Sequence, residues 1–227
     1  MKALLVSLLV LLTGCATQIT KLDVQDIEGS AQIRVTDMRP ALEKKAEIFS
    51  YLITSDAYAI YRLAEEVTTP SAARLLQHRV YESTRSQREP VELKIHHLVV
   101  YKNLQAELRR MAIAVGVGGV IGGAVGGVVG PAMLGEPLLS QSGTIHSIVD
   151  PASFNLLTAK EHQLAWYSEF ENPRRSNVHF VYIETEINGK RVFTRSMVPI
   201  AKATEPVLAL ASALEESIKF HLTQPRL

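Results

Sequence analysis

The sequence VHFVYIETEI-NG-KRVFTRSMVPI, residues 178–200, decides the fold of this chain more than any other stretch. Its two halves, residues 178–187 and 191–200, are rich in β-branched and aromatic residues and flank the pair Asn188-Gly189. Asn-Gly is the favoured pair for a type I′ turn, because both positions take positive φ. The pattern therefore predicts a β-hairpin.

Other strands are predicted from shorter patterns. Residues 91–101 alternate between apolar and polar side chains, which predicts a strand, and residues 31–36 and 144–149 are further candidates. Residues 48–61 fit a helix or a strand, because Tyr51, Tyr58 and Tyr61 recur near helical spacing. The side chains expected on one face of the 91–101 strand are Val91, Leu93, Ile95, His97, Val99 and Tyr101.

Two helices complete the expected fold. Residues 71–84 follow Pro70 and place apolar side chains on one face, and a C-terminal helix opens at Thr204-Glu205-Pro206. The sequence therefore predicts an α+β fold, with a small mixed or antiparallel sheet and packed helices. The expected apolar face of the last helix is Val207, Leu210, Ala211, Leu214, Ile218 and Leu222, with Glu215, Glu216 and Lys219 facing water.

The N-terminus has the features of an export signal. Lys2 precedes an apolar run from Ala3 to Leu12, and no charge follows until Lys21. Ten apolar residues are too few for a helix to cross a ~30 Å hydrocarbon core. The run Leu11-Leu12-Thr13-Gly14-Cys15 resembles the lipobox of bacterial lipoproteins. That resemblance implies cleavage of residues 1–14 and attachment of a diacylglycerol and a further acyl chain at Cys15; a plain secretory signal is the alternative.

A second apolar segment, residues 111–135, contains no charge and lies between Arg109-Arg110 and Glu136. Its glycines recur every fourth residue in two rows, so each row follows one face of a helix. Strips without side chains let helices approach closely in lipid. The segment resembles the glycine-zipper segments of several bacterial envelope lipoproteins and oligomerising membrane helices. The two rows are Gly118, Gly122, Gly126 and Gly130, and Gly119, Gly123 and Gly127.

Three structures remain open for this insert: a helix or helical hairpin that associates with membrane or with other helices, a close-packed helix pair inside the domain, or a glycine-rich loop. A hairpin turning near Gly122-Gly123 would leave both charged flanks on the same side of a bilayer. The expected organisation is a signal peptide (1–14), a lipidated linker (15–30), two halves of a periplasmic α/β domain (31–110 and 136–227) and the zipper segment (111–135) between them.

The composition excludes several function classes. The 227 residues carry a formal net charge of +1, which gives no electrostatic reason to expect a nucleic-acid partner. Cys15 is the single cysteine, so its acylation would leave no thiol for a disulfide, a metal or catalysis. Aromatic residues make up 6% of the chain, which disfavours a carbohydrate groove. No cofactor is expected.

Candidate reactive groups are weak. His96 and His97 are adjacent, so on a regular strand one would face the core interface and the other solvent, and they would not share a metal ion. Asp37-Met38-Arg39 is expected to be a turn-capping aspartate with a surface arginine, or an exposed interaction motif. The remaining groups are the loose set His146, Ser147 and Asp150, and the carboxylate pairs Glu169–Glu171 and Glu184–Glu186.

These features predict a non-enzymatic envelope lipoprotein with a structural or accessory role. The layout, with Val35-Thr36-Asp37-Met38-Arg39-Pro40 as its best local match, is similar to that of small α/β periplasmic accessory lipoproteins. The expected partners are membrane lipid through Cys15 and a homo-oligomer or envelope complex through the zipper. The expected location is the periplasmic face of the outer membrane, because Ala16 replaces the aspartate that favours inner-membrane retention; the inner membrane is the alternative. A lipid- or peptide-binding module and a pore-forming protein are the competing functions.

Overall fold

The computed structural model describes eight ranges of the chain, and the longest stretches outside them are the N-terminus and residues 105–132 and 155–176. Cys15, the seven zipper glycines and the pair Glu169–Glu171 lie outside the described residues, so the predictions made for them stay predictions. The described ranges are 19–25, 27–52, 58–87, 90–104, 133–140, 143–154, 177–200 and 205–224.

The described part of the chain is a mixture of strands and helices, as predicted. The elements follow this order: β1 (Thr20–Lys21), η1 (Ile27–Gln32), β2 (Arg34–Asp37), η2 (Ala41–Lys44), β3 (Glu47–Leu52), β4 (Tyr58–Arg62), η3 (Glu65–Val67), β5 (Thr68–Thr69), α2 (Ala72–Thr84), β6 (Glu92–Leu104), β7 (Met133–Leu139), β8 (Ile145–Val149), η4 (Pro151–Ser153), β9 (Asn177–Ile187), β10 (Lys190–Ile200) and α5 (Pro206–Thr223).

Eight strands form one sheet, in the order β3-β4-β6-β9-β10-β8-β7, and β2 pairs with β6 in parallel. The other neighbours in this sheet are antiparallel. Strands β9 and β10 form the predicted hairpin, with Asn188 at φ 51° and Gly189 at φ 80°. Strands β1 and β5 form a separate two-stranded parallel sheet.

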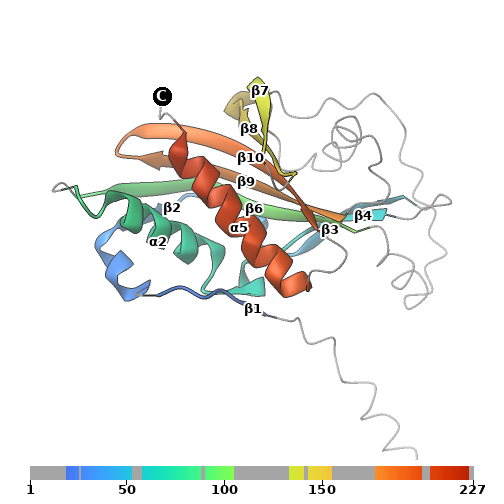
Figure 1. Ribbon diagram of the computed structural model, residues 1–227, viewed down its shortest axis with the longest axis horizontal. Coiled ribbons are helices and arrows are strands. Elements are labelled where there is room, and N and C mark those ends of the chain that lie inside the picture. The colour runs from blue at the N-terminus through green and yellow to red at the C-terminus, as the bar shows by residue number, and fades with distance from the viewer. Residues whose placement is uncertain are drawn as a thin grey trace, which may run out of the picture.

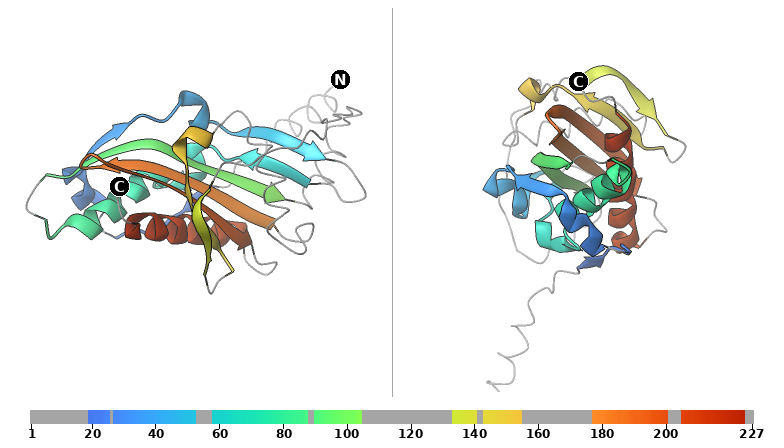
Figure 2. Two further views of the ribbon diagram at one scale, coloured as in Figure 1. Left: turned by 90° about the horizontal axis from the view of Figure 1, so that it is seen from above. Right: turned by 90° about the vertical axis from the view of Figure 1, so that its left-hand side faces the viewer.

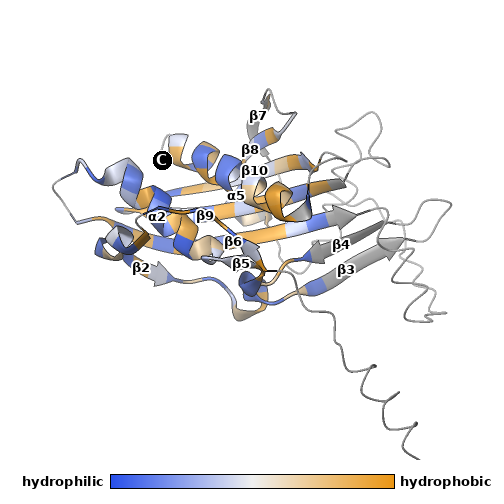
Figure 3. Ribbon diagram, turned by 60° about the horizontal axis from the view of Figure 1, so that its bottom comes forward, coloured by the Kyte–Doolittle hydropathy of each residue, from blue (hydrophilic) through white to orange (hydrophobic). Residues whose placement is uncertain are grey.

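Helices α2 and α5 cover one face of the large sheet (Figures 1 and 2). The main core lies between these helices and the sheet. A second cluster, rich in aromatic residues, lies on the other face of the sheet. Apolar residues recur along β6, β9 and α5 in Figure 3. Within the described residues, no helix combines the length and the apolar character needed to cross a bilayer. The main core includes Leu75, Leu76, Leu93, Ile95, Val181, Ile183, Leu210 and Leu214.

Helix α2 confirms its predicted start. Ser71 is the N-cap residue, and its hydroxyl accepts a hydrogen bond from the Arg74 amide at 3.3 Å. Helix α5 begins at Pro206 as expected, although Glu205 caps it without a side-chain hydrogen bond.

The region 48–61, for which the sequence left helix and strand open, contributes the antiparallel strands β3 and β4. Two other expectations are corrected. Residues 133–135, the end of the predicted zipper segment, belong to strand β7 and are not helical. The strand predicted at 31–36 occupies Arg34–Asp37, because residues 27–32 form a 3-10 helix.

Strand β6 departs from simple alternation. Its register against β9 shifts between Ile95 and His97, where the strand carries an extra residue. Ile95 and Leu98 both join the helix-side core, whereas Val99 and Tyr101 join the aromatic cluster on the other face. The expectation that the odd-numbered residues of 91–101 share one face is therefore wrong beyond Ile95.

Candidate functional site

Buried charged side chains gather at a gap beside β6. Strand β2 pairs with residues 92–95 of β6, and β4 pairs with residues 101–104. Between them, no strand in the described part of the chain pairs with the Leu98 amide on that side. Pro40 ends the extended run that follows β2, because it has no N–H to continue the ladder, and η2 then turns across the gap.

Glu43 of η2 fills this gap with its carboxylate. Its Oε1 atom accepts a hydrogen bond from the Leu98 amide at 2.5 Å, and its Oε2 atom lies 2.7 Å from His97 Nδ1. The residue is only 2% exposed. A buried carboxylate is costly unless it is hydrogen-bonded, so these contacts account for its position. The Glu43 side chain supplies the acceptor that a neighbouring strand would otherwise provide.

His97 connects Glu43 to the centre of the sheet. Its Nε2 atom lies 3.5 Å from Glu184 Oε2, and Glu184 in turn accepts a hydrogen bond from Arg191 Nε at 2.7 Å. The imidazole also lies against the rings of Phe154 and Phe193, at centroid distances of 4.9 and 5.6 Å. The ring is therefore held between two carboxylates and two aromatic side chains.

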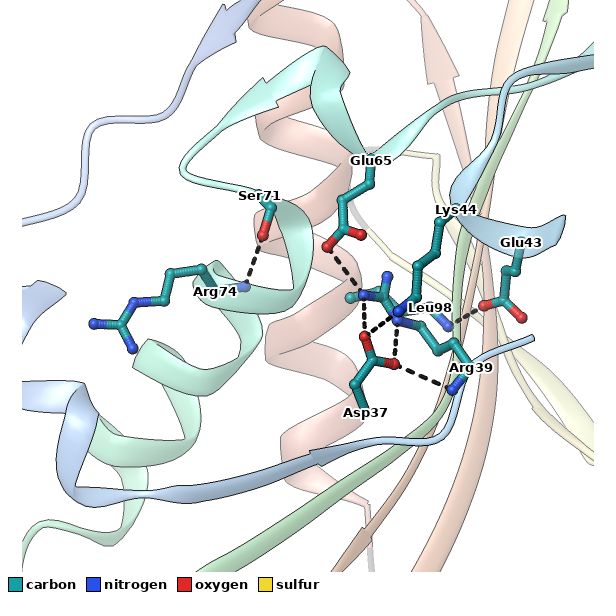
Figure 4. A network of polar contacts seen from close by, with 8 residues as sticks. All are labelled: Asp37, Arg39, Glu43, Lys44, Glu65, Ser71, Arg74 and Leu98. Atoms are coloured by element: carbon teal, nitrogen blue, oxygen red, sulfur yellow. Dashed lines mark hydrogen bonds and ion pairs between the residues drawn. The ribbon is translucent and has the colours of Figure 1, made fainter. Parts of the chain in front are cut away.

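A second group of charges surrounds the guanidinium of Arg39, as Figure 4 shows. Arg39 Nε and Nη2 donate to Asp37 at 2.9 and 2.8 Å, and Nη2 also donates to Glu65 at 2.9 Å. Lys44 Nζ lies 2.7 Å from Asp37 Oδ2. Burial alone would raise the pKa of Asp37, but the hydrogen bonds from Arg39 and Lys44 outweigh it and hold that pKa well below its usual range.

We call these two groups together the polar junction, because they join η2 to β6 on one side and to η3 on the other. It consists of Asp37, Arg39, Glu43, Lys44, Glu65, His97 and Glu184. A cavity of about 30 Å³ beside Arg39 and Glu43 has room for a water molecule but not for a substrate. A carboxylate–imidazole–carboxylate series can hold or pass a proton, and here its contacts give buried polar groups their partners.

The polar junction corrects the expectation for Asp37-Met38-Arg39. Arg39 is 7% exposed and pairs with Glu65, so it is a buried structural arginine rather than a surface one. Met38 between them is 53% exposed. One partner of Arg39, Asp37, is close in the sequence, but its other partner, Glu65, is 26 residues away along the chain.

The two adjacent histidines also differ from expectation. His96 Nε2 lies 3.5 Å from Glu186, and His97 lies beside Glu184, so both imidazoles approach carboxylates that share one face of β9. The bulge in β6 explains this, because it places an extra residue opposite Glu184. Glu184 itself is 1% exposed, so it is a buried carboxylate and not a solvated surface group. Within the described ranges, no cluster of three or more histidine, cysteine or acidic residues is arranged to hold a metal ion.

The structure separates the loose set His146, Ser147 and Asp150. His146 Nδ1 lies 2.8 Å from Ser196 Oγ, and adjacent Ser147 projects from the other face of β8. The Asp150 side chain accepts a hydrogen bond from the Ala152 amide at the start of η4. His146 and Asp150 therefore contact different groups.

A surface groove of about 960 Å³ lies along α2 and α5, a feature that no sequence pattern indicated. Arg79 crosses it and donates to both carboxylate oxygens of Glu215, at 2.9 and 2.6 Å. Glu216 accepts a hydrogen bond from Ser140 at 3.1 Å. Glu215 and Glu216 thus bind neighbouring elements instead of simply facing water. The floor of the groove includes Ile218 and Leu222.

Comparison of the chain with protein-family models, with curated protein sequences and with solved structures gives no match.

Proposed function

We propose that this chain is a non-enzymatic lipoprotein of the bacterial cell envelope, with a structural or accessory role, held at the periplasmic face of the outer membrane through acyl chains on Cys15. The observation that carries the proposal is the run Leu11 to Cys15, which follows a short apolar stretch with a lysine before it. Several acyl chains hold a protein on a bilayer far more firmly than one, because each buried methylene contributes ~0.8 kcal/mol.

The zipper segment, residues 111–135, supplies the second half of the proposal. Seven glycines in two rows would allow backbone contact with another helix, either a second copy of this chain or an envelope partner. For this segment we propose contact with another helix outside the bilayer, because strand β7 begins at Met133, three residues after Gly130, on the opposite side of the domain from β1 (Figure 1). An accessory role is consistent with the polar junction, whose buried charges are arranged as pairs.

The first test is lipidation. Cells given radiolabelled palmitate should label the natural chain and fail to label a Cys15→Ser variant, although Cys15→Ser expressed behind a secretory signal should still reach the periplasm. Equal labelling of both, or of neither, would contradict the anchor.

The second test concerns the zipper. The unlipidated Cys15→Ser chain is purified, and its oligomers are separated on native gels. We expect oligomers that are lost on Gly122→Leu with Gly126→Leu. Val125→Leu is the matched control, because it lies outside both glycine rows. Migration of the unlipidated chain as a monomer would overturn the zipper role.

A ligand-binding accessory module is the second candidate, and the groove of about 960 Å³ along α2 and α5 favours it. In that case a bound lipid or peptide should be recovered from the purified chain by mass spectrometry, and Ser212→Trp at the groove rim should reduce its amount.

A further inference from the structure

The chain is fixed in the fold from its first described strand. Thr20 and Lys21 of β1 pair with Thr68 and Thr69 of β5, and the Leu22 amide donates to the Thr69 carbonyl at 2.8 Å. Thr20 is 3% exposed and Leu22 is 8% exposed, and Leu22 belongs to the helix-side core. The strand therefore cannot easily peel away from the domain to lengthen a tether.

Very little chain separates this strand from Cys15. Four residues lie between Cys15 and Thr20, so the five Cα–Cα steps can span at most roughly 18 Å. An anchor at Cys15 would hold β1 within that distance of the lipid headgroups. Because β1 pairs with β5 and packs beside α5, all three elements would be held near the bilayer.

The surface at this end of the molecule has two exposed apolar residues. Ile19, directly before β1, is 55% exposed, and Leu208, in the first turn of α5, is 58% exposed. Lys21 is also exposed, but so are Glu66 and Glu205, which offset its attraction to anionic headgroups. The short connection between Cys15 and β1 would therefore set the orientation of the domain, and apolar contact with the bilayer would contribute less. A bilayer of zwitterionic lipids is sufficient for this orientation.

The β7–β8 hairpin occupies the opposite end. It lies at the top of Figure 1 and of the right-hand view in Figure 2, whereas β1 and β5 lie at the bottom of both. Leu138 of β7 is 58% exposed there. We propose that the end formed by β1, β5 and the start of α5 faces the lipid bilayer and that the β7–β8 hairpin points away from it. This orientation rests on the proposed anchor at Cys15.

Because the chain has a single cysteine, the orientation can be tested by labelling an introduced cysteine with a fluorophore. Acylation blocks the Cys15 thiol, so an introduced cysteine is the one group left to react with a fluorophore. Lys21→Cys reports the proposed contact, and Leu138→Cys is the matched distal position, because both sites are exposed strand residues. Each lipidated, labelled protein is placed in phosphatidylcholine vesicles that contain a headgroup nitroxide lipid.

We expect fluorescence at position 21 to be quenched at least several-fold more than at position 138. Equal quenching at the two positions, or stronger quenching at 138, would overturn the orientation while leaving the anchor intact. Failure of the labelled protein to float with the vesicles would overturn the anchor, and the orientation with it. Unlipidated Cys15→Ser carrying Lys21→Cys should show no quenching.

Discussion

Two parts of this domain bury polar groups in opposite ways. In the polar junction, Glu43 and Arg39 are buried as members of hydrogen-bonded pairs. At His179 of β9, the imidazole is 1% exposed and its Nδ1 atom has no hydrogen-bond partner among the described residues. Burial, with a smaller contribution from nearby Lys102, lowers the pKa of His179 to about 3. Arg39 and Glu43 are thus buried with hydrogen-bond partners, whereas His179 is buried in a setting that favours its neutral form.

The largest effect is expected at Glu43. Glu43→Ala removes the acceptor for the Leu98 amide and the partner of His97, so the free energy of unfolding should fall by about 3 kcal/mol in urea titrations. Glu43→Gln keeps one oxygen as an acceptor and should cost only about 1 kcal/mol. If both variants lose less than about 0.5 kcal/mol, the carboxylate does not replace strand pairing at the gap.

A smaller effect is expected at His179, and only in acid. Its pKa is about 3 in the folded chain but ordinary when unfolded, so the unfolded state binds the proton first. This contribution to stability is complete above about pH 6.5 and is lost as the pH falls toward 3. Between about pH 7 and pH 5, the natural chain should lose roughly 2 kcal/mol more than His179→Met. Parallel pH profiles for the two proteins would contradict a neutral buried imidazole.

The smallest effect is expected at Asp37, which is partly open to solvent. Asp37→Asn should cost less than about 1 kcal/mol at neutral pH, because solvent screens the ion pairs. The pKa of Asp37 is depressed on folding, so this contribution is present above about pH 4 and is lost as the pH falls through the lower folded value. Asp23→Asn, at an exposed carboxylate, is the control for stability measured across the same acid range. If the difference in unfolding free energy between Asp37→Asn and the control stays the same into strong acid, the ion pairs of Asp37 with Arg39 and Lys44 do not stabilise the fold.

Local patterns predicted the elements whose signals lie within a few residues. Asn188-Gly189 and the alternation around it were sufficient for β9 and β10, and Ser71 marked the start of α2. The polar junction could not be found in this way, because the partner of Glu43 is 55 residues away and becomes a neighbour only when the sheet has formed. The prediction of which face His97 occupies failed for a different reason. Alternation assumes a regular strand, and no local sequence pattern indicates the extra residue in β6.

That extra residue reverses, from that point on, which side chains of β6 face the helices. Before it, odd-numbered side chains such as Leu93 and Ile95 supply the helix-side core, and after it the even-numbered Leu98 and Val100 do so. One strand thereby furnishes both cores of the domain. Removing a single residue at His96 would exchange the faces of everything downstream, turning Tyr101 toward the helices. A one-residue change in length is therefore a more severe event for this strand than a conservative substitution at any one position along it.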